Sequence, residues 1–213
     1  MGSQAVLRWL DGQGWLVFSA GRSDEIRALT LGIAAADGGI ATIVMGTTAD
    51  QTLQDLIDLG GPTGYIVDVL TEDDMTIRQK LGEASVIVIT DHPDVADLRS
   101  ALFGAAEAGI RDAYLNGAVV LVEGRSCMVF GAWVVLEAGE LVGGFEWLEA
   151  ALVIPSLVSI AQSPEAIAVL DAQPSAIAVG MGPGSALALG PENQVEPWGN
   201  KQVTVALGRD YQT

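Results

Sequence analysis

Short uninterrupted apolar runs, separated by segments of helical length, are the feature that most narrows what this chain can fold into. The runs show no polar alternation, which is typical of strands covered by helices on both faces. Their alternation with helical segments favours an α/β fold with a mostly parallel sheet. The expected strands are Trp15–Ser19, Ile40–Met45, Tyr65–Val69, Ser85–Ile89, Ala118–Val122 and Ala151–Ile154.

Helical segments lie between these runs. Ser23 is a suitable N-cap for the first of them, and Asp24 and Glu25 complement the positive end of its dipole. The sequence Asp37-Gly38-Gly39 is a typical helix end. The expected helices are Ser23–Asp37, Asp50–Leu59, Glu72–Gly82 and Pro93–Asn116, the last being one helix or two helices broken near Gly104.

The pattern changes after Pro164, where strand-like runs become shorter and turns more frequent. Turn residues at Gly182–Gly184 and Pro191–Asn193 predict a C-terminal β-hairpin region that finishes the sheet. No repeat or long linker interrupts the chain, so residues 1–213 are expected to form a single α/β domain. The runs in question are Ala176–Val179, Ser185–Leu189 and Gln202–Ala206.

Charge limits the kinds of partner. The chain has 27 acidic and 10 basic residues, a formal net charge of −17, while half of its residues are hydrophobic. Such a chain can build a core, but it lacks the basic surface that nucleic acids and anionic membranes require. The acidic exterior either keeps the protein soluble or meets a basic partner.

Several classes of site and location have no support. Cys127 is the only cysteine, which excludes an internal disulfide and fits a reducing, cytoplasmic compartment. The segment Met1–Trp15 has no signal-peptide pattern, and prolines and glycines break the uncharged stretch Ala172–Pro191, so no membrane span is expected. No cluster has metal-ligand spacing, and the glycines of Gly180–Gly184 lack a dinucleotide-binding context, so no metal or cofactor is expected.

One segment carries a catalytic pattern. The run from Gly117 to Phe130 is expected to form a strand, a tight turn and a helix, with Ser126 at the turn and Gly124 two residues before it. This is the arrangement of a nucleophile elbow, although Met128 stands where its second glycine belongs. The alternative is that Ser126 is an ordinary N-cap serine.

The wider sequence resembles the cyanophycinase and aspartyl-dipeptidase family of serine peptidases, which has the class I glutamine-amidotransferase-like, flavodoxin-like fold. Gly124 and Ser126 match the family's elbow, G-T-S-A-G-A. Weaker likenesses follow in the family's order from about residue 14 to about residue 208. They are Gly21–Asp24, Thr47–Asp50, Asn116–Val120, Gly144–Leu148, and Ala178–Met181 with Ser185–Leu189.

The same resemblance implies a degenerate catalytic triad. The family's histidine base falls on Ser156, and its glutamate falls on Pro183. Neither residue accepts a proton near neutral pH, and a serine hydroxyl needs a base to become a nucleophile. The family's glycine turn near residue 91 is also lost, which removes support for an oxyanion hole.

Other residues are candidates to replace the missing groups. His92, the only histidine, follows a strand at the carboxyl edge of the sheet, where Asp91 or Asp94 would orient it. The alternative is a loop histidine that caps the next helix or faces solvent. Cys127 is a second candidate nucleophile, but the position of Gly124 selects Ser126 and leaves Cys127 as a small buried residue.

Arg125 adds a positive charge beside this pocket, where it either holds a carboxylate or pairs with Glu123. The main hypothesis is a non-catalytic, peptidase-like protein that acts as a binding, regulatory or structural subunit. Its partner would be another protein, a second copy or a larger complex. The alternative is a serine hydrolase of small or acidic peptides that uses Ser126 and His92. A third hypothesis is small-ligand binding in the vestigial pocket.

Overall fold

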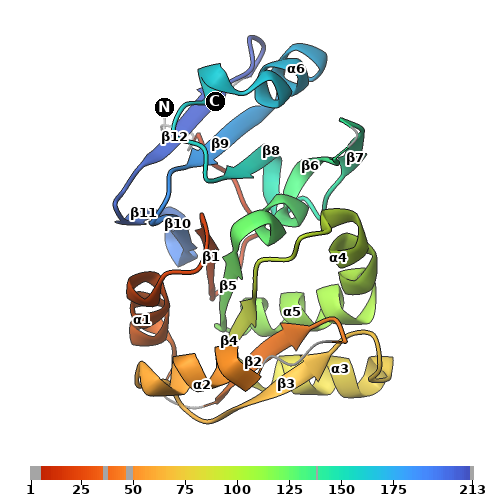
Figure 1. Ribbon diagram of the computed structural model, residues 1–213, viewed down its shortest axis with the longest axis vertical. Coiled ribbons are helices and arrows are strands. Elements are labelled where there is room, and N and C mark those ends of the chain that lie inside the picture. The colour runs from red at the N-terminus through yellow and green to blue at the C-terminus, as the bar shows by residue number, and fades with distance from the viewer. Residues whose placement is uncertain (1–5, 36–37, 47–49, 138, 212–213) are drawn as a thin grey trace.

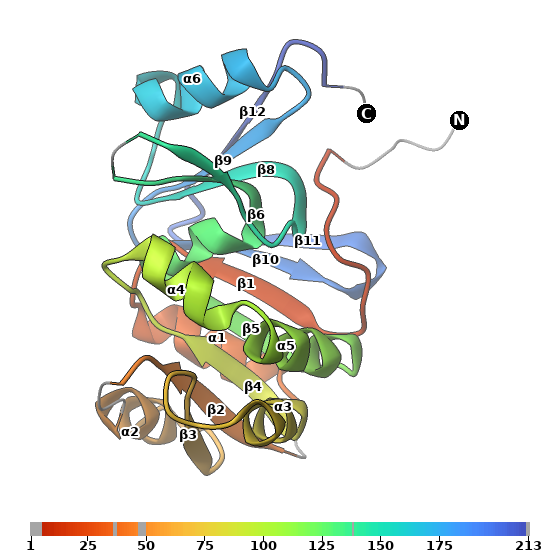
Figure 2. The same ribbon diagram turned by 90° about the vertical axis from the view of Figure 1, so that its right-hand side faces the viewer.

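Two β-sheets form the framework of the protein. The computed structural model describes residues 6–35, 38–46, 50–137 and 139–211. The sheets are stacked along the long axis of the molecule (Figures 1 and 2). The larger sheet contains, in spatial order, β11 (Gln194–Gly199), β10 (Ser185–Gly190), β1 (Trp15–Ser19), β5 (Val119–Glu123), β4 (Ala84–Ile89), β2 (Gly39–Val44) and β3 (Gly64–Asp68).

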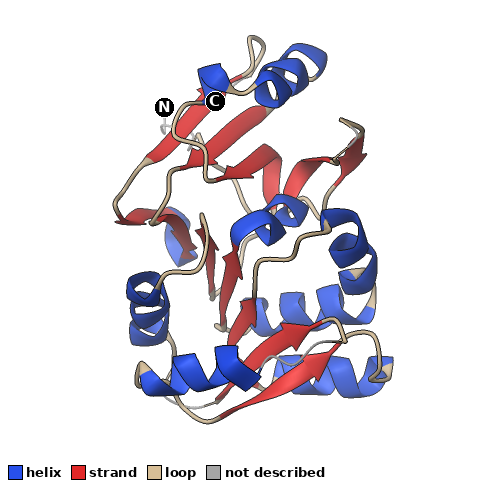
Figure 3. Cartoon of the chain, viewed as in Figure 1, coloured by secondary structure: helices blue, strands red, loops and turns tan. Residues whose placement is uncertain are grey.

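Helices cover both faces of this sheet, as Figure 3 shows. Strands β1, β5, β4, β2 and β3 run parallel, and β10 and β11 add to their edge in antiparallel fashion. Helices α1 (Asp24–Ile33) and α2 (Asp50–Asp58) bury apolar residues on one face. Helices α3 (Asp74–Gly82), α4 (Val95–Leu102) and α5 (Ala105–Leu115) cover the other. The predicted mostly parallel, flavodoxin-like α/β fold is therefore confirmed.

Two of the predicted helices differ in their ends. The helical segment that begins near Pro93 is divided into α4 and α5 by Gly104, whose φ of +102° interrupts the helix. Helix α1 ends at Ile33 rather than at Asp37. The reason is that Ala34 takes an extended conformation and its N–H donates to the carbonyl of Leu31, which closes the last turn early.

The second sheet was not expected from the sequence. The predicted C-terminal hairpin is only partly right, because β10 and β11 pair in the larger sheet whereas the strands on either side of them pair in the other sheet. Helix α6 (Pro164–Ala172) was also not predicted. The second sheet contains, in order, β12 (Val203–Leu207), β9 (Ile177–Met181), β8 (Leu148–Pro155), β6 (Gly131–Val135) and β7 (Leu141–Gly143).

A shared apolar cluster joins the two sheets. It contains Phe18 and Val122 of the larger sheet together with Val153 and Val179 of the smaller one. The single domain over residues 1–213 stays a prediction, which this shared core supports. Among the described residues, no helix combines the length and the apolar character needed to cross a bilayer.

Candidate active site

The end of β5 forms the turn that the sequence identifies as a nucleophile elbow. The helix that follows it, η1 (Gly124–Phe130), is a 3-10 helix that leads directly into β6, not the α-helix of a standard elbow. Gly124 begins this turn with φ of +59°, a left-handed conformation that glycine adopts without strain. The left-handed residue after the strand is therefore Gly124, two positions before Ser126.

Ser126 is fully buried at this turn. Its Oγ donates to the carbonyl of Thr90 at 2.6 Å and accepts from the backbone N–H of His92 at 3.1 Å. Both partners are backbone groups of the loop that follows β4. In this conformation the hydroxyl ties η1 to that loop and is closed to solvent.

The backbone of His92 contacts Ser126, but the imidazole ring of His92 contacts the backbone of Asp94 instead. Its Nδ1 is 2.7 Å from the carbonyl oxygen of Asp94 and 3.2 Å from the backbone nitrogen of the same residue. The carboxylate of Asp94 instead caps α4 by accepting from the N–H of Asp97 at 2.9 Å. Among the described residues, no carboxylate hydrogen-bonds the His92 ring, so neither Asp91 nor Asp94 orients it in the predicted manner.

Asp91 occupies the space above Gly124. Its Oδ1 accepts a 2.8 Å hydrogen bond from the backbone N–H of Arg125 and lies 3.7 Å from that residue's Nε. A Cβ atom added to Gly124 would overlap the Asp91 carboxylate. The aspartate side chain thus fills the place that a side chain at position 124 would need, and it also accepts the hydrogen bond of the Arg125 N–H.

Glu123 pairs with Arg27 of α1, and the predicted pairing with Arg125 is wrong. The guanidinium donates from Nε and Nη2 to the two carboxylate oxygens, each at 2.8 Å. Both side chains are almost completely buried, with exposed fractions of 1% and 2%. Burial alone would lower the pKa of Arg27, but the hydrogen bonds and charge of Glu123 outweigh it and raise that pKa.

The two positions to which the family's base and acid align carry no titratable side chain. Ser156 follows β8 with φ of +60°, and its Oγ donates to the carbonyl of Ala20 at 3.0 Å. Pro183 lies in the exposed turn between β9 and β10, where its carbonyl accepts from Asn200. Of the resembling segment Thr47–Asp50, residues 47–49 lie outside the described part of the chain.

Cys127 is fully buried in η1. Burial raises the pKa of its thiol well above the usual value. A thiol in this state is a poor nucleophile. The described residues contain no group of three or more His, Cys, Asp or Glu side chains arranged to hold a metal ion.

A small hollow of about 280 Å³ lies where β2 and β4 end. Thr90, Asp91 and His92 line one side of it. In open α/β sheets, ligand sites form between neighbouring strands whose following connections go to opposite sides of the sheet. Strands β2 and β4 are such neighbours, because β2 connects to β3 on one side and β4 connects to β5 on the other. The position suits the hypothesis of a vestigial ligand pocket, which stays a prediction.

Sequence reasoning missed Arg27, the residue that holds Glu123. A signal for it exists, because Ile26, Arg27 and Thr30 are the residues that α1 buries. An arginine that helical periodicity places on a buried face requires an acidic partner. The chain offers many acidic residues, so the identity of the partner needed the structure.

Comparison with known proteins agrees with this architecture. No protein-family model and no curated protein matches the chain. A solved peptidase from an acI-B1 Actinobacterium superimposes with a TM-score of 0.73 at 19% identity, over 95% of each chain. A protein named for peptidase E, from Listeria monocytogenes EGD-e, gives a TM-score of 0.65 at 13% identity, over 87% of this chain and 98% of that one. The chain therefore has a peptidase-like fold.

Proposed function

We propose that this chain is a non-catalytic relative of the cyanophycinase-like serine peptidases and acts as a binding or regulatory subunit of an assembly. The observation that carries the proposal is the position of Asp91 over the turn at Gly124. In a nucleophile elbow, the reactive side chain stands on the strained residue after the strand. Here that residue is Gly124, which has no side chain to react.

The same aspartate also occupies the anion-binding part of the turn. In an elbow, the backbone N–H of the residue after the nucleophile stabilises the developing oxyanion. The corresponding N–H belongs to Arg125, and it donates to the Asp91 carboxylate. A negatively charged group thus already takes the donor that a negatively charged transition state would need.

The surroundings of the remaining triad positions support the same conclusion. Ser156 and Pro183 supply neither a base nor an acid, and Ser126 is closed to solvent by its hydrogen bonds to the β4 loop. A cytoplasmic location and a protein partner or second copy complete the proposal. The single buried cysteine and the net charge of −17 support these two points.

A serine peptidase that uses Ser126 and His92 is the second candidate, and the names of the structural neighbours favour it. For that activity, Ser126 Oγ must leave the carbonyl of Thr90, and the His92 ring must leave the backbone of Asp94. Substrate must also reach a hydroxyl that is now fully buried. The candidate therefore requires the β4 loop to rearrange.

Labelling with a fluorophosphonate probe separates the two candidates. The purified protein, its Ser126→Ala variant and an active serine hydrolase are treated side by side, and the adduct is measured by intact-mass spectrometry. We expect no adduct on the wild-type chain and full labelling of the hydrolase. An adduct that disappears in Ser126→Ala and in His92→Ala would overturn the proposal and establish the peptidase.

A further inference from the structure

A groove of about 530 Å³ adjoins the turn, and Arg125 and Met128 are part of its lining. It is lined by the start of α4, by η1, by β8, by the loop between β6 and β7, and by the start of α6. Figures 1 and 2 both show the β6–β7 hairpin above α4, with α6 farther along the molecule. The volume is in the range of sites that bind small molecules or a few side chains.

The walls of the groove are mainly apolar. They include Val95 and Ala96 of α4, Met128 of η1, Val135 of β6, and Ile154 of β8. An unbranched hydrocarbon stem would bury its apolar surface against these residues, and the removal of that surface from water is favourable. The groove therefore favours a ligand with an apolar part several carbon atoms long.

The charged lining of the groove is acidic. Its carboxylates belong to Asp94, Glu137, Glu140 and Glu165, whereas Arg125 is its only cationic side chain among the described residues. Arg125 is itself close to Asp91, outside the groove. The charge in the groove is therefore negative, and it would repel an anionic peptide.

Two of these carboxylates accept hydrogen bonds at the starts of helices, and the other two lie on an exposed loop. Asp94 accepts from the N–H of Asp97, and Glu165 accepts from Ser163 Oγ, so the helix starts present carboxylates to the groove. Glu137 and Glu140 are exposed on the β6–β7 loop, and neither lies in an ion pair with any residue that the structure describes.

We propose that this groove docks a lysine- or arginine-bearing segment of a partner protein. The apolar walls hold the methylene stem of the basic side chain, and the carboxylates of Glu137 and Glu140 hold its charged end. This inference rests on the proposed function, because it names the chemistry of the partner that a non-catalytic subunit would bind. A second copy of the chain suits the groove poorly, since it has only 10 basic residues against 27 acidic ones.

Peptide titration tests the proposal. The probe is the acetylated, amidated peptide Ala-Lys-Leu-Lys-Ala, with Ala-Glu-Leu-Glu-Ala as its counterpart, each titrated into the full chain by calorimetry. We expect only the lysine peptide to bind, and we expect its affinity to fall as salt rises. Absence of binding by the lysine peptide, or preference for the glutamate peptide, would overturn the proposal.

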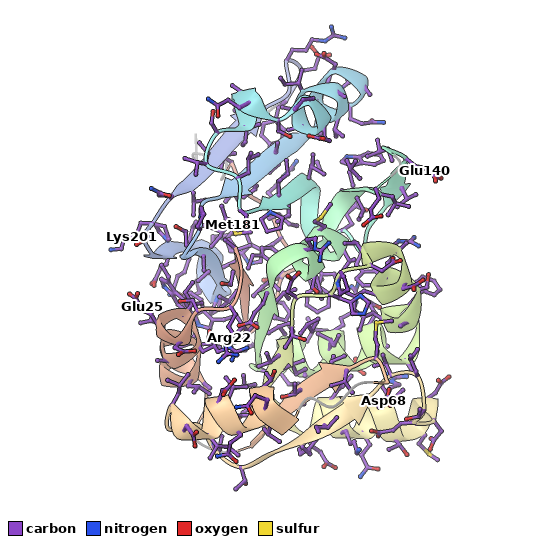
Figure 4. All side chains as sticks on the ribbon, in the orientation of Figure 1. Arg22, Glu25, Asp68, Glu140, Met181 and Lys201 are labelled. Carbon is purple, nitrogen blue, oxygen red and sulfur yellow. The ribbon has the colours of Figure 1, made fainter. Side chains whose placement is uncertain are left out.

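A pair of matched variants separates the groove from the general negative charge. The double variant Glu137→Gln/Glu140→Gln removes two charges beside the groove. Glu25→Gln/Glu192→Gln removes two exposed charges that do not line it. Figure 4 shows Glu25 and Glu140 on opposite sides of the molecule. We expect the groove variant to weaken lysine-peptide binding at least tenfold and the control variant less than twofold; equal losses would overturn the proposal.

The same samples distinguish this inference from the proposed function. Mass spectrometry of the peptide after titration reports whether it is cleaved. Cleavage would overturn the proposed function, while the preference for a basic segment would still stand. An intact peptide that does not bind would overturn only the inference on the groove.

Discussion

Two acid–arginine pairs flank Gly124, and they differ in almost every physical respect. Glu123 and Arg27 meet through two hydrogen bonds of 2.8 Å, with exposed fractions of 2% and 1%. Asp91 and Arg125 meet at 3.7 Å, with about half of each side chain exposed. The first pair joins α1 to the end of β5, and the second covers the turn that follows.

The difference shows that residues close in sequence can serve separate purposes. Removal of one member of a buried ion pair leaves the other charge uncompensated and lowers the free energy of unfolding by about 3–5 kcal/mol. An exposed pair contributes about 0–1 kcal/mol, because water and salt screen it. We therefore assign structural stability to the buried pair and occupation of the turn to the exposed pair.

The largest effect is expected for Glu123→Gln. This variant removes the carboxylate that hydrogen-bonds Arg27 and leaves Asp55, 3.6 Å from Arg27 Nη1, as its nearest acidic partner, so the free energy of unfolding should fall by an amount toward the lower end of about 3–5 kcal/mol. Urea denaturation followed by circular dichroism measures the change. The double variant Glu123→Leu/Arg27→Met should recover most of the loss, because no buried charge is left unpaired; a loss below about 1 kcal/mol in the single variant would contradict the assignment.

A smaller loss, about 1–3 kcal/mol, is expected for Gly124→Ala. The backbone at this position requires a left-handed conformation, which strains alanine, and the new Cβ overlaps Asp91. Combining it with Asp91→Gly should remove the overlap but not the backbone strain, so the two changes should not be additive. Strict additivity in urea denaturation would mean that Asp91 does not occupy the space above Gly124.

Asp91→Asn is the matched counterpart of Glu123→Gln, since each variant replaces one carboxylate by an amide. The asparagine oxygen can still accept from the N–H of Arg125, and the lost charge is exposed. We expect the free energy of unfolding to change by less than about 1 kcal/mol. A loss as large as that of Glu123→Gln would remove the distinction between the two pairs.

The smallest effect concerns Cys127, which lies just beyond the turn. Because burial raises the pKa of its thiol, the native protein should react very slowly with Ellman's reagent at pH 8, and unfolding in urea should release one reactive thiol. The native rate should be the same in Asp91→Asn. Faster labelling in that variant would show that the exposed pair also keeps η1 closed.

The parallel part of the larger sheet could be predicted from the sequence. The second sheet could not, although three of its strands, β8, β9 and β12, coincide with predicted strand-like runs. Strands such as β4 consist of one apolar run buried on both faces, which gives a strong local signal. Strand β7 has only three residues, and β6 is half-buried, so neither produces a distinctive pattern. Their strand structure depends on pairing with β8 and with each other, and such contacts are not visible locally.

For the candidate site, which stays a prediction, the sequence pointed to two segments but not to the contacts of their side chains. The sequence identified the turn after β5 and the loop after β4, and hydrogen bonds join these two segments. The orientation of Asp91 toward Arg125, and of Glu123 toward Arg27, depends on which side of the chain each side chain takes after its strand. That choice follows from the packing of α1 and η1, which a linear pattern does not contain.

The aspartate over Gly124 also limits how this turn can change. Any route, natural or engineered, that would place a nucleophile at position 124 must first remove or move Asp91, because the two side chains would occupy one volume. A single substitution in either order gives an intermediate with no reactive group or with a steric conflict. A nucleophile at position 124 therefore requires changes in two loops, one at position 124 and one that removes or displaces Asp91.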